Sequence, residues 1–369
     1  MRFTCEKNML VTGLNITGRT VAQKSALSAI EGILCKAGDG LSLTGYNMET
    51  AITYIIDAEV GETGACILPA KLFSDIVRKL PEGLVTVVVD DNYKVSVRAG
   101  YANFNISAEP ADDYPELPDV GDGKSIRIPQ TAMKELIGGT IFAVSENQGR
   151  PIHTGVKFEV DGDAVSAIAV DGFRLARRTY HCETSTGRNL SFVVPAQGLK
   201  EVEKILQDGD ADVAFTLGSR HILFQFGCAT LVCRLLDGEF LDWRKVVPTD
   251  CPVKLVANVY DLAASIDRVG LIVSEKYKSP VRCVFSNQEV MLRTNTTIGA
   301  AEDRCTIAGD GKELEIGFNV RYLADALRVI PSEEVVLELT NGLSPIVMTP
   351  VDEKHDFSYM VLPVRIKNG

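Results

Sequence analysis

The sequence lacks the short motifs that mark common nucleotide-binding and hydrolytic enzymes. It contains no GxGxxG, no GxxxxGK(S/T) and no GxSxG, the patterns that bind dinucleotides, cradle phosphates or present a nucleophilic serine. The tetrapeptide GDGK occurs at 121–124 and 309–312, but in an expected linker and an expected turn, without a phosphate-loop helix after it. These absences predict a protein that is not an enzyme.

Metal-binding and disulfide patterns are missing as well. The nine cysteines include no Cys-x-x-Cys, and the closest pair, Cys228 and Cys233, is too isolated for a zinc site. The four histidines form no HExxH. We expect buried, reduced thiols and neither a metal nor a cofactor.

Long apolar runs are also absent. No stretch approaches the roughly 18–20 apolar residues of a membrane-spanning helix, and the opening MRFTCEKNML lacks the apolar core of a signal peptide. Apolar residues still make up 46% of the 369 positions, which is enough for sizeable cores. We expect a soluble, cytoplasmic protein without a membrane partner.

Positive charge is in short supply. The chain has 38 Lys and Arg against 49 Asp and Glu, a formal charge of −11. Taken alone, this balance disfavours nucleic acid, because DNA-binding proteins carry a basic excess. Net charge is a sum, however, whereas a partner responds to the local field. The distribution of the cations therefore decides the question.

The chain does contain a short strand–helix unit that occurs three times. An apolar strand end runs into a helix in ILPAKLFSDIVRKL (67–80), VVPAQGLKEVEKIL (193–206) and IGFNVRYLADALRVI (316–330). The matching starts at residues 69, 195 and 319 are evenly spaced by about a third of the chain, far more than the period of a solenoid repeat. The unit therefore indicates a repeated domain.

Each copy lies within a longer pattern of helix, strands, helix and strands, which includes an expected helix over 130–145 and an expected last strand over 358–366. Stretches at 108–124 and 238–252 are typical of linkers, and they predict domains at 1–126, 127–250 and 251–369. Each domain should pack two helices on antiparallel sheets, which is an α+β fold. The expected apolar stripes of the repeated helices are Leu72, Ile76 and Leu80, widened by Phe73 and Val77; Leu199, Val202 and Leu206; and Val320, Leu323, Leu327 and Ile330.

Basic residues recur on the faces opposite these stripes. Lys71, Asp75 and Arg78 in the first helix have the same spacing as Arg321, Asp325 and Arg328 in the third. One such face is typical of an ordinary solvated helix, but three equivalent ones favour contact with DNA phosphates without base reading. The candidate DNA-facing residues are Arg19, Lys24, Lys71, Arg78, Lys134, Arg150, Lys200, Lys204, Lys276, Arg321 and Arg328.

Five further segments resemble one family when taken in order over the whole chain. They are DGFRLA (171–176), DGEFLDWRKVVP (237–248), SEKYKSPVR (274–282), EIGFNVRYLADAL (315–327) and YMVLPVRI (359–366). With the threefold repeat, they are similar to the bacterial replicative sliding clamp, the β subunit of DNA polymerase III holoenzyme. The resemblance implies a head-to-tail homodimer whose six domains form a ring around duplex DNA.

The resemblance also implies a function without catalysis. Such a clamp tethers the replicative polymerase and gives it processivity. Its implied partners are double-stranded DNA, a second copy of itself, the catalytic subunit of DNA polymerase III, the clamp-loader complex, and other DNA polymerases and repair proteins with clamp-binding motifs. The alternative is a scaffold that binds peptides without encircling DNA, which the acidic charge favours and the basic helix faces disfavour.

The resemblance further implies a hydrophobic pocket for short partner motifs between the second and third domains. The matching positions are Val170, Gly172, Phe173, Arg174, Leu175, Leu241, Lys245, Val246, Val247, Tyr322, Leu343, Met360, Leu362, Pro363, Val364 and Arg365. Leu, Val, Met and Pro side chains suit a short apolar peptide. Alternate positions of the last strand, such as Val361, must instead point into the core.

The dimer contact implied by the resemblance joins an edge strand of the first domain to the third domain. Its candidate residues are Tyr101, Phe104 and Ile106 on one side and Leu271 and Ile272 on the other. An unpaired edge strand invites such pairing, and a solvent-covered edge is the alternative.

Overall fold

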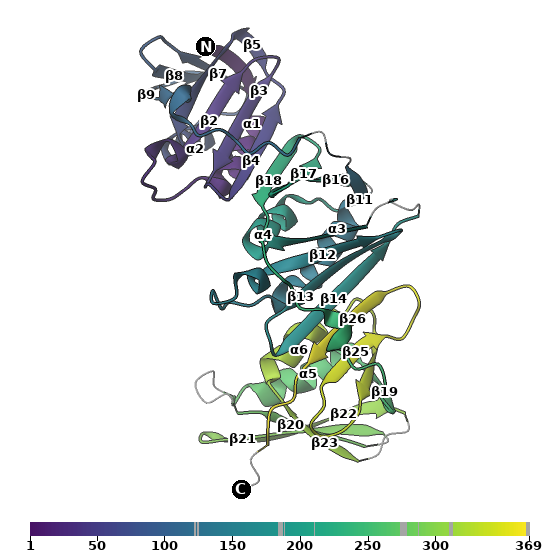
Figure 1. Ribbon diagram of the computed structural model, residues 1–369. Helices are drawn as coiled ribbons and strands as arrows, with labels where there is room; N and C mark the ends of the chain where they lie inside the picture. Colours follow the sequence, from purple (N-terminus) through teal and green to yellow (C-terminus); the bar gives the residue numbers. More distant parts are fainter. Residues whose placement is uncertain are drawn as a thin grey trace. The chain divides into compact units, whose positions relative to one another are not determined.

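A computed structural model describes residues 1–121, 123, 125–183, 187, 189–209, 211–273, 279–286, 288–309 and 313–366. Within these ranges, the order strand, helix, strands, helix, three strands occurs three times (Figure 1). The predicted α+β repeat is therefore confirmed.

The elements of the first repeat are β1 (Arg2–Glu6), α1 (Lys7–Thr17), β2 (Gly32–Ala37), β3 (Leu41–Tyr46), β4 (Thr50–Ile56), β5 (Glu59–Glu62), β6 (Gly64–Pro69), α2 (Ala70–Lys79), β7 (Leu84–Val89), β8 (Lys94–Ala99) and β9 (Ala102–Ser107), followed by the short β10 (Glu109–Pro110). Those of the second are β11 (Ile126–Pro129), α3 (Gln130–Gly138), β12 (Gly155–Asp161), β13 (Ala164–Val170), β14 (Arg174–His181), β15 (Asn189–Pro195), α4 (Ala196–Ile205), β16 (Asp212–Leu217), β17 (His221–Phe226) and β18 (Ala229–Arg234). Those of the third are β19 (Val253–Asn258), α5 (Val259–Gly270), β20 (Val281–Phe285), β21 (Glu289–Thr296), β22 (Gly299–Ala308), β23 (Leu314–Phe318), α6 (Val320–Arg328), β24 (Glu334–Leu339), β25 (Ile346–Pro350) and β26 (Asp356–Val361).

The chain divides into two compact units. Each unit contains one whole outer repeat and part of the middle repeat. Unit 1 comprises Met1–Thr131 and Gln197–Leu235, and unit 2 comprises Ala132–Ala196 and Leu236–Gly369. The division follows from strand pairing, because β18 joins β4 of the first repeat while β14 joins β26 of the third. The domain limits at 126 and 250 remain a prediction from the sequence repeat.

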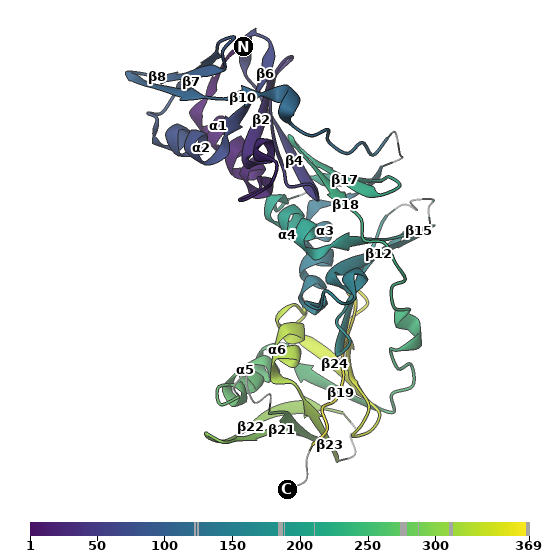
Figure 2. The same cartoon turned by 60° about the vertical axis from the view of Figure 1, so that its left-hand side comes forward.

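Unit 1 contains two antiparallel sheets. One has the order β5-β1-β7-β8-β9, and the other the order β10-β6-β2-β3-β4-β18-β17-β16-β11. Helices α1 and α2 contact each other, α1 also contacts β3 and β4, and α2 contacts β2 and β6 (Figure 2). The two helices therefore cover one face of the longer sheet, and their apolar sides close the core of the first repeat.

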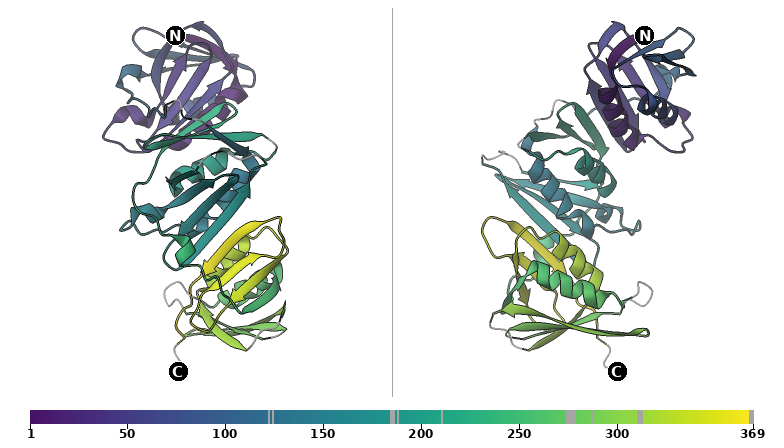
Figure 3. Two further views of the ribbon diagram at one scale, coloured as in Figure 1. Left: turned by 45° about the vertical axis from the view of Figure 1, so that its right-hand side comes forward. Right: turned by 180° about the vertical axis from the view of Figure 1, so that it is seen from behind.

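Unit 2 contains one long ladder of strands in the order β15-β12-β13-β14-β26-β25-β24-β19-β22-β21-β20-β23. Helices α5 and α6 contact each other, and α5 packs on β19, β21 and β22 (Figure 3). The link from β19 to β22 uses only Ala308 and Ile307 of β22. Residues 299–306 of β22 therefore pair with β21 on one side only among the described residues.

The repeated helices bury their expected stripes with two exceptions, Leu72, which is exposed, and Val320, which is half-buried. Leu199, Val202 and Leu206 are buried, as are Leu323 and Leu327. In and directly after α2, Leu72 is 49% exposed, whereas the other expected residues are buried: Phe73, Ile76, Val77 and Leu80. The expectation for Leu72 was wrong because the i, i+3, i+4, i+7 series that shares one helix face starts at Phe73.

Two other boundaries differ from the prediction. Helix α3 ends at Gly138 rather than near 145, after which Thr140 donates its hydroxyl to the Leu136 carbonyl at 2.7 Å. The last strand ends at Val361 rather than Ile366, because Pro363 has no N–H with which to continue a ladder. Residues 362–366 therefore leave the sheet.

The nine cysteines are free, and seven are buried. Cys182 is half-buried and Cys228 is exposed, so the expectation of burial was wrong for these two. Within the described ranges, no group of three or more His, Cys, Asp or Glu side chains is placed to hold a metal ion. In the same ranges, no helix has the length and apolar character needed to cross a membrane.

The burial pattern predicts different costs for one substitution at two positions of unit 1. Leu199→Ala should lower the free energy of unfolding by about 2–5 kcal/mol, because it leaves a cavity under a fully covered side chain. Leu72→Ala, at an exposed position of the equivalent helix, should change it by about 0.5 kcal/mol or less. Urea denaturation followed by circular dichroism measures both, and equal costs would contradict the assignment of the buried faces.

Candidate functional site

An apolar cluster joins the middle and last repeats within unit 2. Its buried members are Ile168, Leu175, Val347 and Met360, and Phe240, Trp243, Val247 and Leu362 pack against them half-buried. We call these eight residues the apolar cluster. Four of them, Leu175, Val247, Met360 and Leu362, are residues that the sequence predicts for the peptide pocket.

Strand pairing brings the distant parts of this cluster together. β14 and β26 are antiparallel with Leu175 opposite Met360, and β25 pairs with β26 so that Val347 is also opposite Met360. Beyond the strand end, the Leu362 N–H donates to the Phe173 carbonyl at 2.9 Å. The tail is thereby held beside the 171–174 turn.

The single tryptophan, Trp243, packs half-buried against the buried members of the cluster. Two guanidinium groups lie over the Trp243 ring, that of Arg177 at 4.9 Å and that of Arg244 at 4.5 Å from the ring centroid. Arg244 also pairs with Glu159 at 3.0 Å. Although burial alone would raise it, hydrogen bonds from Arg244 and Lys157 lower the pKa of Glu159. Charged groups thus hold Trp243 over the apolar side chains.

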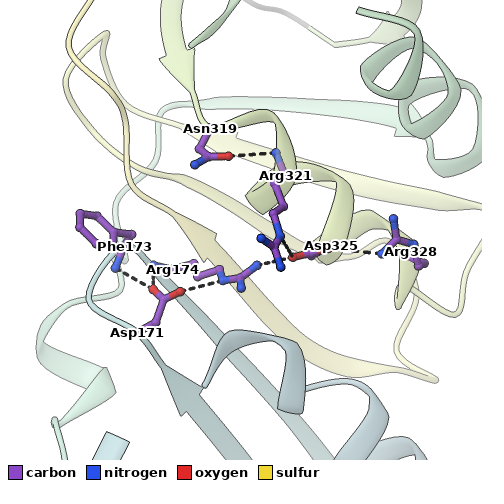
Figure 4. Close-up of polar contacts among 7 residues, drawn as sticks. All are labelled: Asp171, Phe173, Arg174, Asn319, Arg321, Asp325 and Arg328. Atoms are coloured by element: carbon purple, nitrogen blue, oxygen red, sulfur yellow. Dashed lines mark hydrogen bonds and ion pairs between the residues drawn. The ribbon is translucent and has the colours of Figure 1, made fainter. Parts of the chain in front are cut away.

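A second group of side chains lies at the start of β14. The Phe173 ring is 60% exposed and stacks on Tyr322 of α6 with 6.2 Å between centroids. The Arg174 guanidinium lies 4.5 Å from the Tyr322 ring and is itself buried. Burial, followed by the Asp171 carboxylate, raises the pKa of Tyr322. Figure 4 shows Arg174 between Asp171 and Asp325.

The other predicted pocket residues differ in burial. Val170 is buried at the end of β13, opposite Leu175, and Gly172 adopts φ 91° in the turn, where a side chain would be strained. The Val364 N–H donates to the Gly317 carbonyl at 2.8 Å, and Pro363 beside it is half-buried. The exposed members are Leu241, Lys245, Val246, Leu343, Val364 and Arg365.

Sequence reasoning missed four members of the cluster: Ile168, Val347, Phe240 and Trp243. Ile168 and Val347 sit in ordinary apolar strands, so no motif marks them. Phe240 and Trp243 lie within the 237–248 segment, next to residues that the resemblance did select. Their aromatic character in a polar linker was the signal that could have identified them.

His153 is a further side chain at the edge of the cluster. Its ring meets Phe240 edge-on with 5.2 Å between centroids, and its Nε2 is buried without a hydrogen-bond partner among the described residues. Burial, followed by the charge of Arg150, lowers the pKa of His153. This environment therefore disfavours the protonated imidazolium form of His153.

Most candidate DNA-facing residues are exposed. This holds for Arg19, Lys24, Lys71, Arg78, Arg150, Lys200, Lys204, Arg321 and Arg328, whereas Lys134 is half-buried. Lys276 lies outside the described residues. In unit 1, Arg19, Lys71 and Arg78 line one hollow of about 870 Å³ between α1 and α2. Glu31 and Asp75 line the same hollow, so cations and carboxylates share its surface.

Each repeated helix holds its last-turn cation with a carboxylate three positions earlier. The distances are 3.4 Å for Asp75 and Arg78, 2.8 Å for Glu201 and Lys204, and 3.3 Å for Asp325 and Arg328. Arg19 of the first repeat adds a 3.5 Å contact to Glu201. The cations are therefore fixed in position and partly neutralised at the same time.

The candidate dimer residues are accessible. Tyr101 is fully exposed beside the edge strand β9, and Phe104 within β9 is 39% exposed. Leu271 follows α5 and is 84% exposed. Ile106 and Ile272 are half-buried.

Comparison with protein families matches nearly the whole chain. The models for the N-terminal, central and C-terminal domains of the DNA polymerase III beta subunit match residues 1–118, 127–242 and 244–365.

Individual proteins are similar over the same extent. The beta sliding clamp of Bacillus subtilis is 31% identical, over 99% of this chain and 100% of the relative. A crystal structure of the DNA polymerase sliding clamp from Bacillus subtilis has a TM-score of 0.95 and covers 100% of both chains. A putative DNA polymerase III beta subunit from Eubacterium rectale has the same TM-score with 34% identity, over 99% of this chain and 100% of that one.

The environment of His153 predicts a pH dependence. An unfolded chain protonates histidine near pH 6.5, whereas His153 in the folded chain does so at lower pH. The unfolded state therefore binds more protons as the pH falls below about 6.5, and the contribution of His153 to stability is lost in that direction. His153→Phe should make stability less dependent on pH in this window, measured by urea denaturation. A ring titration by NMR at or above pH 6.5 would contradict the assignment.

Proposed function

The chain belongs to the DNA polymerase III beta-subunit family, and from this premise we infer that it is a sliding clamp that encircles duplex DNA and tethers the replicative polymerase to it. It is a processivity factor and carries out no chemistry itself. The observation that supports the ring most directly is the way in which strands of successive repeats pair.

Two such pairings repeat one geometry. In the first, β4 lies antiparallel to β18, with Tyr54 opposite Ala229. In the second, β14 lies antiparallel to β26, with Leu175 opposite Met360. Each time, the third strand after the first helix of one repeat pairs with the last strand of the next repeat. We call these two pairings the seams.

A third seam is left incomplete among the described residues of one chain, although both of its strands are present. The equivalent strands are β22 of the third repeat and β9 of the first. β9 ends its sheet, and residues 299–306 of β22 pair on one side only among the described residues. We propose that β22 of one copy pairs with β9 of a second copy, which closes a head-to-tail ring of six domains.

The proposed dimer seam uses the residues implied by the resemblance. Phe104 and Ile106 belong to β9, and Tyr101 precedes it. Helix α5 packs on β22, so that Leu271 and Ile272, which follow α5, would lie beside the new pair of strands. Apolar packing next to main-chain hydrogen bonds is typical of strand addition.

The basic helix faces are the proposed DNA contact. Diffuse phosphate contact suits a clamp that slides, because it has no preferred register on the sequence. The acidic remainder of the chain accounts for the net charge of −11 without opposing a basic inner track, since screening confines each field to about 10 Å.

We propose the apolar cluster, with Phe173 and Tyr322, as the site for partner motifs. An apolar floor with the exposed cations Lys245 and Arg365 among the proposed site residues suits a short hydrophobic peptide with polar flanks. The proposed partners are the catalytic subunit of DNA polymerase III, the clamp loader, and other polymerases and repair proteins that carry clamp-binding motifs. The proposed location is the cytoplasm. A peptide scaffold without DNA encirclement is the second candidate, because the acidic charge favours it.

Encirclement predicts a topological retention. The protein should have the mass of a dimer in solution, and once assembled on closed circular DNA it should remain bound through gel filtration in moderate salt and be released when the circle is cut. Phe104→Asp should give a monomer that is not retained, because a carboxylate would be buried in the apolar seam. Phe173→Asp, also at an exposed phenylalanine, is the control and should leave mass and retention unchanged. Equal escape from circular and linear DNA would support the scaffold instead.

The peptide site predicts a localised loss of affinity. Leu362→Ala should weaken binding of a synthetic peptide with leucine and phenylalanine side chains by about tenfold or more, because it removes an apolar anchor. Emission from Trp243, the single tryptophan, reports the binding. Leu84→Ala, at an exposed leucine of unit 1, is the matched control. Equal affinity of the two variants would place the peptide elsewhere.

A further inference from the structure

One carboxylate connects the proposed peptide site to the proposed DNA face. Asp325 lies on α6, and its side chain is 17% exposed. Its Oδ2 accepts a 2.6 Å hydrogen bond from Arg174, 151 residues away in sequence. Its Oδ1 lies 3.3 Å from the Arg328 guanidinium, and Arg321 approaches Oδ2 at 3.9 Å (Figure 4).

Arg174 is part of the peptide site and has little freedom. Its Nε donates to Asp171 at 2.9 Å, and its guanidinium lies over the rings of Tyr322 and Phe142 at 4.5 and 5.4 Å. Asp171 also accepts from the Phe173 N–H at 2.9 Å. A change in the pairing of Arg174 should therefore alter the position of the Phe173 and Tyr322 rings beside the apolar cluster.

Arg321 and Arg328, unlike Arg174, are exposed. Their side chains are 64% and 69% exposed, and both are candidates for phosphate contact. A single carboxylate carries one negative charge, which Arg174, Arg321 and Arg328 share. An anion that binds Arg321 and Arg328 weakens their attraction to Asp325, so the attraction between Asp325 and Arg174 becomes stronger.

The equivalent helix of the first repeat provides a comparison. Asp75 in α2 occupies the same place relative to Lys71 and Arg78 as Asp325 does to Arg321 and Arg328. Asp75 pairs with Arg78 at 3.4 Å, but its side chain is 58% exposed. The buried pairing with an arginine from the peptide site distinguishes Asp325.

We propose that Asp325 couples the two sites, so that contact of α6 with DNA phosphates strengthens peptide binding, and peptide binding strengthens DNA contact. This inference rests on the proposed function of both sites. When DNA phosphates pair with Arg321 and Arg328, Asp325 pairs more strongly with Arg174. The stronger pairing holds Arg174 against the Tyr322 ring and so preorganises the stack of Tyr322 with Phe173. In return, a peptide that holds Arg174 on Asp325 frees the two outer arginines for DNA. Linkage requires both effects to have the same size.

The experiment measures the affinity of the leucine–phenylalanine peptide, from Trp243 emission, with and without a saturating short duplex DNA at low salt. Wild-type protein should bind the peptide at least about fivefold more tightly with DNA present. The duplex should in turn bind more tightly to the peptide-saturated protein by the same factor. The salt dependence of its binding should also steepen by roughly one to two phosphate contacts.

Asp325→Asn should reduce the ratio of the two peptide affinities to about one, because the amide carries no charge to share. Asp325→Glu, which restores the carboxylate, should recover part of the ratio. Asp75→Asn is the matched control: it removes an equivalent carboxylate beside a DNA-facing arginine, and it should keep the wild-type ratio. If Asp325→Asn does not fold, the exposed double variant Arg321→Gln/Arg328→Gln tests the same route and should also reduce the ratio to about one.

The outcomes separate this inference from the proposed function. A wild-type ratio of one, with peptide and DNA both bound, overturns the coupling and leaves the clamp function intact. An unchanged ratio in Asp325→Asn, or an equal loss in Asp75→Asn, also overturns the role of Asp325. Absence of peptide binding in the wild type, or of retention on circular DNA, contradicts the proposed function itself.

Discussion

Main-chain hydrogen bonding between strands of different repeats is the interaction on which the rest of the structure depends. Buried N–H and C=O groups must find partners, and an edge strand satisfies its own by adding a neighbour. In β4–β18 and β14–β26, the neighbour comes from the next repeat. The register of the second seam places Leu175 opposite Met360, so the proposed peptide site follows from the pairing that joins two repeats. The same requirement leaves β9 and β22 as the pair that a second copy would complete.

Charge is arranged around this framework in a way that resolves the contrast between an acidic chain and a DNA-binding function. Each repeated helix places a carboxylate three residues before its last-turn cation. Such pairs at the surface contribute little to stability, but they hold long side chains in place and moderate their attraction to DNA. Moderate, repeated attraction is what sliding requires, since a strong local contact would fix the protein at one place. In α6 the equivalent carboxylate, Asp325, also accepts a hydrogen bond from Arg174. This bond connects the Asp325–Arg328 pair to the proposed peptide site.

The sequence predicted the order of elements well, because hydrophobic period and turn residues are local properties. The buried stripes of α4 and α6 follow from apolar spacing alone. Leu72 was misplaced because Leu72 and Phe73 are both apolar, and which of them faces the sheet depends on how the helix is rotated on it. The last strand was extended too far, although Pro363 was a local signal for its end. His153 shows the same limit in the site: it belongs to no motif, and only its packing against Phe240 reveals its environment. Trp243 lies in the 237–248 segment, but its contact with the apolar cluster depends on tertiary packing.

By itself, the sequence determined the threefold repeat, the α+β class, the basic faces of the repeated helices and, through the resemblance of five segments, the family. These depend on residue type and spacing along the chain. The tertiary structure decided which apolar residues form one cluster, which strand edges are left without a partner, and that Asp325 meets Arg174. Contacts between residues far apart in sequence depend on strand register and helix rotation. Register and rotation are set by packing and by the satisfaction of backbone hydrogen bonds across repeats, and no local pattern specifies them.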